Sequence, residues 1–218
     1  MTSITIRELR ADDIDEYCRF LTVNFYGHEP VLQTPGDHKI VTDTPEKRET
    51  RLAIIRQGLS LVAVDSSNEG RIVGCAYSEE MVPNDLEINW NKVNEKKPTT
   101  FLDHVHLLLS GVEMRSKFFE RFGVSKALFL NILTVDATVR NQGIGRRLVA
   151  ALIKLGRSKG FPLIAVSCTS LYSTRVMSAL GMSCVHSENY SDFKDEDGNV
   201  VLKPPAPHTS VNLMAMKL

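Results

Sequence analysis

The chain has 218 residues, of which 43% are hydrophobic and 24% charged, and this ordinary globular composition excludes long disordered stretches. Its 26 Lys and Arg residues balance 26 Asp and Glu residues, so no net charge favours nucleic acid or an anionic membrane as a partner. No apolar run reaches the roughly 18 residues that a membrane-spanning helix needs, and the first residues lack the apolar core of a signal peptide. The four cysteines are widely spaced with no CxxC pair, so we expect reduced thiols and a cytoplasmic protein.

Strand and helix signals alternate in the first half of the chain. Alternation of apolar and polar residues indicates strands, and apolar residues at helical spacing indicate helices. The predicted elements are a strand over 3–9, a helix over 12–25, a helix from Thr44 to about Gln57, and strands over 59–64 and 71–81 around a turn at 66–70. Residues 82–100 are polar and contain two prolines, which favours an excursion over the surface near a ligand.

The second half continues the alternation. The run ALFLNILTV is almost entirely apolar, which is typical of a strand that is buried on both faces. The predicted elements are a helix over 101–122, a strand over 127–135, a glycine-containing loop over 139–145, a helix to 160, a strand over 161–168, a helix over 170–180, and strands over 182–190 and 210–216 with a turn at 192–199. This order argues for an α/β or α+β fold.

The most informative stretch leads from the buried strand through Arg-Asn-Gln-Gly-Ile-Gly into a helix. Gly143 and Gly145 would let the backbone approach a ligand closely, and the helix N-terminus offers free N–H groups and the positive end of its dipole. Arg140, Arg146 and Arg147 add positive charge, so the loop suits a pyrophosphate. It is neither a P-loop, because no Gly-Lys-Ser/Thr follows, nor a dinucleotide GxGxxG. A glycine loop that is only a tight turn stays open as an alternative.

This motif resembles the acetyl-CoA motif of the GNAT superfamily of N-acetyltransferases, whose pattern is Q/R-x-x-G-x-G/A. The resemblance implies a single GNAT domain over 1–218, with a mixed, mostly antiparallel twisted sheet of about seven strands, flanked by helices and splayed between strands four and five. It also implies acetyl-CoA as cosubstrate. The residues expected to bind it are Leu133, Thr134, Val135, Arg140, Asn141, Gln142, Gly143, Ile144, Gly145 and Arg146.

Three further stretches are similar to the insect arylalkylamine N-acetyltransferases: 24–31, 168–181 and 207–214. The resemblance implies that the protein acetylates the primary amine of small arylalkylamines such as dopamine, tyramine, octopamine or serotonin. It implies that Glu29, followed by Pro30, is the general base. It also implies that Thr169, Ser173 and His208 lie at the amine site.

Several alternatives remain at this stage. Many superfamily members carry a tyrosine as general acid where this chain has Met177, so Ser173, Tyr172 or solvent would have to protonate the thiolate. The acceptor could be a polyamine or an agmatine-like amine, the donor a longer acyl-CoA, and a non-catalytic CoA-binding module is a further reading. We expect no metal, because His104 and His106 would lie on different faces of a helix, and we expect a monomer.

Overall fold

A seven-stranded sheet forms the centre of the computed structural model, which describes residues 3–36, 38 and 40–218. The strand order is β1-β2-β3-β4-β5-β7-β6. The strands are β1 (Ile4–Glu8), β2 (Leu61–Asp65), β3 (Arg71–Met81), β4 (Ala127–Val135), β5 (Leu163–Cys168), β6 (Ser183–Asn189) and β7 (Ser210–Lys217). The pair β4–β5 is parallel and the other neighbours are antiparallel, so the expected mixed, mostly antiparallel α/β fold is confirmed.

The expected splay lies between β4 and β5. Their pairing is confined to Leu128 with Ile164 and Phe129 with Ala165, although β4 continues to Val135 and β5 to Cys168. On its other edge β4 stays paired with β3 as far as Val135. From Leu130 to Val135, β4 therefore presents an edge that is not paired with β5.

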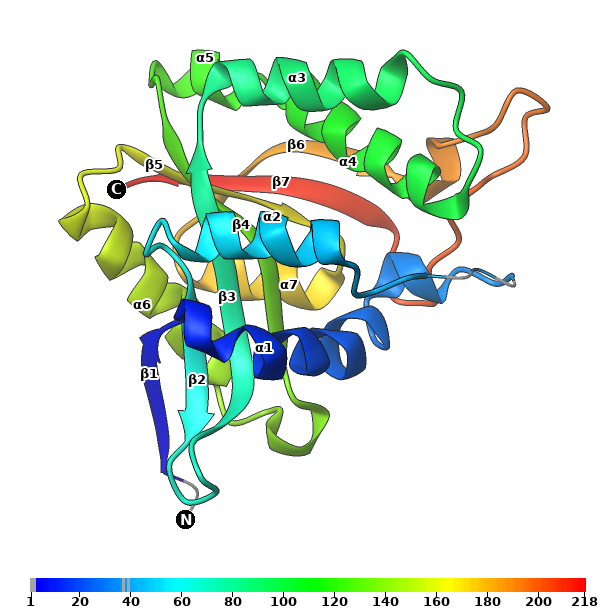
Figure 1. The fold of residues 1–218 in the computed structure, drawn as a ribbon. Helices are drawn as coiled ribbons and strands as arrows, with labels where there is room; N and C mark the ends of the chain where they lie inside the picture. The colour runs from blue at the N-terminus through cyan, green and yellow to red at the C-terminus, as the bar shows by residue number, and fades with distance from the viewer. Residues whose placement is uncertain (1–2, 37, 39) are drawn as a thin grey trace.

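Helices cover both faces of the sheet (Figure 1). They are α1 (Ile14–Leu21), α2 (Pro45–Ile55), α3 (Pro83–Asn94), α4 (Phe101–Ser116), α5 (Phe118–Phe122), α6 (Ile144–Ser158) and α7 (Leu171–Ala179). Short helical turns are η1 (Ala11–Asp13), η2 (Thr22–Tyr26), η3 (Pro30–Gln33), η4 (Ala137–Val139) and η5 (Tyr190–Asp192), and η2 is a π-helical turn that continues α1.

The strand residues show which helices share a face. On β5, Leu163 and Ala165 join the apolar cluster of α4 and α5, whereas Ile164 and Val166 join the cluster of α6 and α7. The α1–α2 cluster includes Tyr77 of β3, and Met81, four residues further along the same face, joins the α4–α5 cluster. One face therefore carries α1, α2, α4 and α5, the other carries α6 and α7, and the β4–β5 opening connects the two.

The expected surface excursion over 82–100 is wrong, because most of it forms α3. Pro83 occupies the first turn, where its missing N–H costs nothing, and the Asp85 carboxylate accepts the Val82 N–H at 2.8 Å. Leu86 is buried and Trp90 follows one turn later, so α3 packs on α4. Pro83, which seemed to mark a loop, thus marks a helix start.

The helix expected over 101–122 is divided in two. Lys117 adopts a left-handed conformation (φ 49°) between α4 and α5. The break turns Phe118 and Phe119 into the core, where both rings are buried. The turn at 192–199 forms as expected, with a bridge between Lys194 and Val200.

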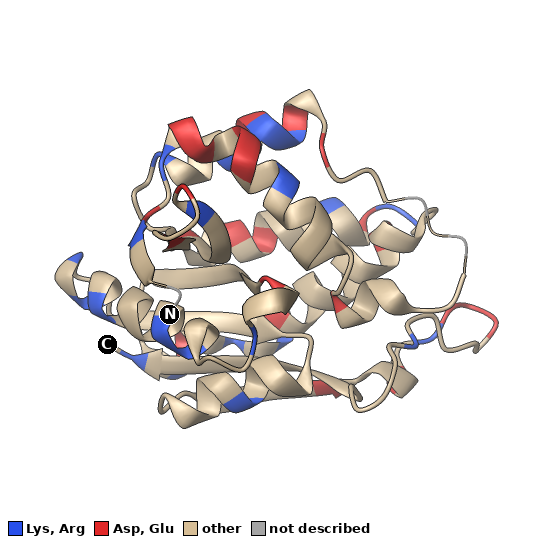
Figure 2. Cartoon of the chain, turned by 90° about the horizontal axis from the view of Figure 1, so that it is seen from below, with Lys and Arg blue, Asp and Glu red and all other residues tan. Residues whose placement is uncertain are grey.

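Charge and hydropathy show no dominant surface feature. Lys and Arg positions are interspersed with Asp and Glu positions along the elements (Figure 2). Within the described residues, no helix is both long and apolar enough to cross a membrane.

Candidate active site

The glycine loop forms the N-terminus of α6, beside the end of β4. The Asp136 carboxylate begins the loop by accepting the Thr138 N–H at 2.9 Å, and Arg71 of β3 pairs with it at 2.8 Å. Gly143 has φ 72°, in the left-handed region, and the first intrahelical bond runs from the Arg147 N–H to its carbonyl at 3.0 Å. The amides of residues 144–146 therefore precede the helix ladder and are available to an anion.

Gly145 keeps this cradle open. A Cβ added there would lie 3.7 Å from the Val135 side chain and 4.0 Å from that of Leu133, in ordinary contact and without a clash. A larger side chain would extend into the space between the loop and the uncovered edge of β4. The residues thus fit a pyrophosphate on the α6 amides with an extended chain along β4.

A cavity of about 750 Å³ runs from this loop to the segment that follows α1. It brings together most of the predicted site. The predicted residues that line it are Glu29, Pro30, Leu133, Thr134, Val135, Arg140, Asn141, Gly143, Ile144, Gly145, Arg146, Ser173 and His208. Gln142 and Thr169 do not line it. Asn24, Arg175 and Val176 do, and no sequence signal singled them out.

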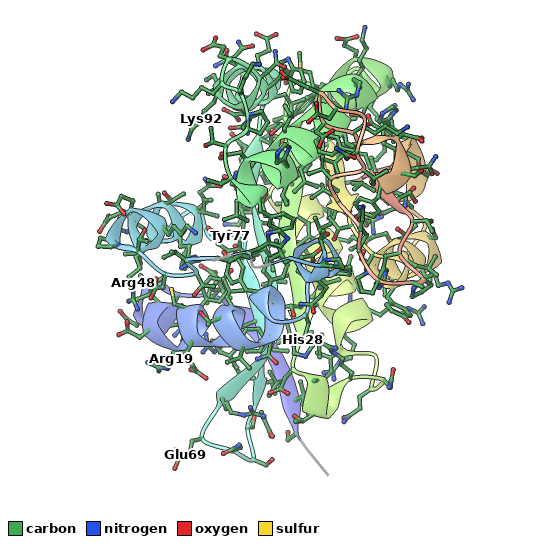
Figure 3. The ribbon with its side chains drawn as sticks, turned by 90° about the vertical axis from the view of Figure 1, so that its right-hand side faces the viewer. Arg19, His28, Arg48, Glu69, Tyr77 and Lys92 are labelled. Carbon is green, nitrogen blue, oxygen red and sulfur yellow. The ribbon has the colours of Figure 1, made fainter. Side chains whose placement is uncertain are left out.

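Glu29 lies where the chain turns from η2 into η3. Its N–H donates to the Phe25 carbonyl at 2.8 Å, and its carboxylate caps η3 by accepting the Val31 N–H at 3.5 Å. Burial raises the pKa of the Glu29 carboxyl, while a hydrogen bond from the Thr169 hydroxyl lowers it by a smaller amount. The result is a carboxyl whose pKa is raised, facing a cavity that also holds the glycine loop. His28, beside it (labelled in Figure 3), donates its Nδ1–H to the Val23 carbonyl at 3.2 Å.

The N-terminus of α7 forms another wall. Ser170 caps the helix, accepting the Ser173 N–H at 2.9 Å, and the two hydroxyl oxygens are 2.8 Å apart. His208 accepts the Leu171 N–H on Nδ1 at 3.1 Å, so its neutral ring carries the proton on Nε2. The Tyr172 ring lies edge-on to His208 with centroids 5.4 Å apart. This wall therefore offers hydroxyl and imidazole donors.

Two residues near this wall are packing residues. Met177 of α7, which stands where the family resemblance led us to expect a general acid, is fully buried in the apolar cluster that α6 and α7 form with the sheet. Cys168 is also buried, and burial raises the pKa of its thiol to about 12, so it stays protonated. The four cysteines are free thiols.

A second acidic group, which the sequence did not reveal, lies on the α4 side of the opening. Glu113 of α4 accepts the Ser167 hydroxyl of β5 at 2.9 Å, and Glu79 of β3 accepts the Asn131 amide of β4 at 2.8 Å. Burial raises the pKa of Glu113 to about 7, and the charge of Glu79 adds to the effect.

Among the residues described, no cluster of three or more His, Cys, Asp and Glu side chains could hold a metal ion.

A sheet opened beside β4, with a glycine-rich helix N-terminus at the same cavity, defines the class of acyl-CoA-dependent transferases. The chain belongs to the acetyltransferase (GNAT) family, whose model matches residues 33–182. Acetyltransferases with this fold use acetyl-CoA and an amine.

Solved structures of several N-acetyltransferases, two of them from insects, are similar over nearly the whole chain. Arylalkylamine N-acetyltransferase 2 from Aedes aegypti is 25% identical with a TM-score of 0.87, covering 99% of each chain. The polyamine N-acetyltransferase of Drosophila melanogaster, which forms N-acetylagmatine, is 27% identical with a TM-score of 0.86, covering 99% of this chain and 100% of its own. An agmatine N-acetyltransferase is 28% identical with a TM-score of 0.86, covering 99% of each chain.

Proposed function

We propose that this protein, as one domain over 1–218, acetylates the primary amine of small arylalkylamines with acetyl-CoA, using Glu29 as general base. The observation that carries the proposal is the half-buried Glu29, whose carboxyl has a raised pKa, on the same cavity as the α6 amides and the free edge of β4. Similarity to an Aedes arylalkylamine N-acetyltransferase supports the substrate class.

The role of Glu29 follows from the charge of the acceptor. An alkylamine is protonated at neutral pH and cannot attack a thioester until a base removes a proton. The Glu29 carboxylate attracts the cation and, with its pKa raised by burial, accepts the proton better than an exposed glutamate. The free amine then attacks the acetyl carbonyl directly, and no acyl-enzyme is needed. Thr169 holds the carboxylate by its hydroxyl.

The chain must also protonate the departing thiolate. We assign this role to Ser173, whose hydroxyl lines the cavity and belongs to the α7 cap. His208 and Pro30 complete the amine pocket. With the Leu171 N–H on its Nδ1, neutral His208 presents only a donor on Nε2 and does not compete with Glu29 as a base.

The experiment measures thiol release from acetyl-CoA with phenethylamines, indolamines and agmatine for the parent, Glu29→Gln and Glu29→Ala. We expect both variants to lose about 10²- to 10⁴-fold in kcat, the range for one positioned acid–base group, with acetyl-CoA affinity unchanged. In the parent, kcat/KM should rise with pH through a pKa above that of ordinary glutamate, because deprotonated Glu29 is the active form. A Glu29→Gln enzyme with parental kcat and pH profile would remove Glu29 as the base.

A second candidate substrate class is favoured by Glu113 and Glu79. A diamine or a guanidino-amine carries a second cation, and acidic side chains bonded to β4 and β5 beyond their last paired residues suit it. The similarity to enzymes that acetylate polyamines and agmatine supports this alternative. The same amine panel separates the two: preference for agmatine in the parent, lost in Glu113→Gln, would replace the arylalkylamine assignment.

A further inference from the structure

The segment that carries Glu29 is attached to the strand that forms one side of the β4–β5 opening. Thr134 of β4 donates its hydroxyl hydrogen to the Asn24 carbonyl at 2.9 Å, across 110 residues of chain. Both residues line the cavity and both are nearly inaccessible, at 8% and 7% exposure. A buried polar pair of this kind is costly to break, because the carbonyl would lose its partner away from water.

Asn24 is the buried member of the π-helical turn η2, which spans Thr22–Tyr26. The wider π-turn is rare and recurs at functional sites. The Asn24 side-chain amide also donates to the Phe20 carbonyl at 3.3 Å, and this bond fixes the turn to α1. The bond from Thr134 thus reaches the centre of the irregular turn.

The path from Asn24 to Glu29 is short and rigid. The Glu29 N–H bonds to Phe25, the residue after Asn24, at 2.8 Å. At Gly27 the chain passes so close to the Val23 carbonyl that a Cβ would lie 2.7 Å from its oxygen. A displacement of Asn24 would therefore displace the carboxyl of Glu29 as well.

Thr134 connects the cosubstrate edge of β4 to the segment that carries Glu29. Its backbone is paired with Cys75 of β3 in the part of β4 that β5 leaves uncovered, and its side chain holds η2. We propose that Thr134 is a positioning residue, which sets Glu29 against the cosubstrate edge of β4 through the Asn24 carbonyl. The inference rests on the proposed role of Glu29 as the base.

The groups that face the Glu29 carboxyl are few. Tyr190 and Cys168 are close enough to sense its charge, and the other titratable or charged side chains on the cavity are His28, His208, Tyr172, Arg140, Arg146 and Arg175. None of them contacts the Thr134 hydroxyl. A change in the pH profile on altering Thr134 therefore reports on Glu29.

The test compares Thr134→Val, which removes the donor at similar size, with Thr134→Ser, which keeps the hydroxyl. We expect the valine variant to lose roughly 10- to 100-fold in kcat/KM for tyramine, the scale of a misplacement of about 1 Å, and the serine variant, which keeps the hydroxyl donor, to lose clearly less. The ascending limb of the valine variant should move to lower pH, because a released Glu29 gains water. If valine prevents folding, Thr134→Ala removes the same bond with less crowding.

Two controls make the result decisive. Ser60→Ala removes another buried hydroxyl, which donates to the Ser78 carbonyl at 3.0 Å outside the cavity, and should leave the pH profile unchanged. In a double-mutant cycle, Thr134→Val should have little further effect in a Glu29→Gln background, because both changes act through one group. Additive losses, a parental pH profile in Thr134→Val, or equal losses in Thr134→Ser would overturn the proposal. A fully active Glu29→Gln enzyme would instead refute the proposed base itself.

Discussion

Because of Glu113, we expect the free energy of unfolding of the protein to fall as pH rises from 4.5 to 7. Its carboxyl has a pKa of about 7 in the folded protein against 4.5 for the ordinary value. The folded state therefore binds a proton that the unfolded state releases between these two values. The stabilisation is complete below pH 4.5 and is lost as pH rises to 7. A pKa unit corresponds to about 1.36 kcal/mol, so the loss is at most about 3 kcal/mol.

Glu113→Gln should abolish this loss, since the amide keeps the shape and an acceptor for Ser167 but cannot ionise. Relative to the parent, the free energy of unfolding of the variant should rise by up to about 3 kcal/mol between pH 4.5 and 8. For a protein of this length, the difference in Tm between the variant and the parent should grow by roughly 6–12 °C over the same pH range.

Urea unfolding followed by the fluorescence of Trp90, the single tryptophan, measures this effect. Trp90 is a suitable probe, because the Arg115 guanidinium of α4 lies 5.9 Å from its ring. Glu120→Gln, which changes an exposed glutamate of α5, is the matched control and should give no pH-dependent difference. A difference between Glu113→Gln and the parent that stays constant across this pH range would refute the assignment of a buried, proton-retaining Glu113.

Two further predictions concern the cofactor loop and the thiolate. Gly145→Val should abolish acetyl-CoA binding in calorimetry while the Tm stays parental, because a Cβ there meets only ordinary contacts in the protein and the methyl groups beyond it fill the cradle; unchanged affinity would contradict the anion site. Ser173→Ala should lower kcat by roughly 10-fold, below the usual contribution of an acid because solvent can substitute, whereas Tyr172→Phe should not; an effect confined to Tyr172 would move the role to its phenol.

The sequence alone determined the order of the seven strands and singled out the glycine loop before α6. Both depend on local patterns: the apolar run of β4, the amphipathic period of α6, and glycines at positions such as Gly143 that need left-handed backbone. Family resemblance placed Glu29 in a motif, and the structure puts it on the same cavity as that loop.

Local patterns failed where one signal has two meanings or where the tertiary setting decides. Pro83 was taken for a loop marker, but a proline also suits the first turn of a helix. The break at Lys117 has no turn residue to announce it and arises as Phe118 and Phe119 enter the core.

Only the tertiary structure brought together groups that are distant in the chain. The hydroxyl of Thr134 bonds to the Asn24 carbonyl because η2 packs against β4. Ser167 bonds to Glu113 because α4 packs against β5. The raised pKa of Glu113 comes from burial, which depends on every element around it and leaves no mark in the residues beside it. The nature of the chemistry was thus readable from local sequence, whereas the alignment of its groups arises from packing between distant segments.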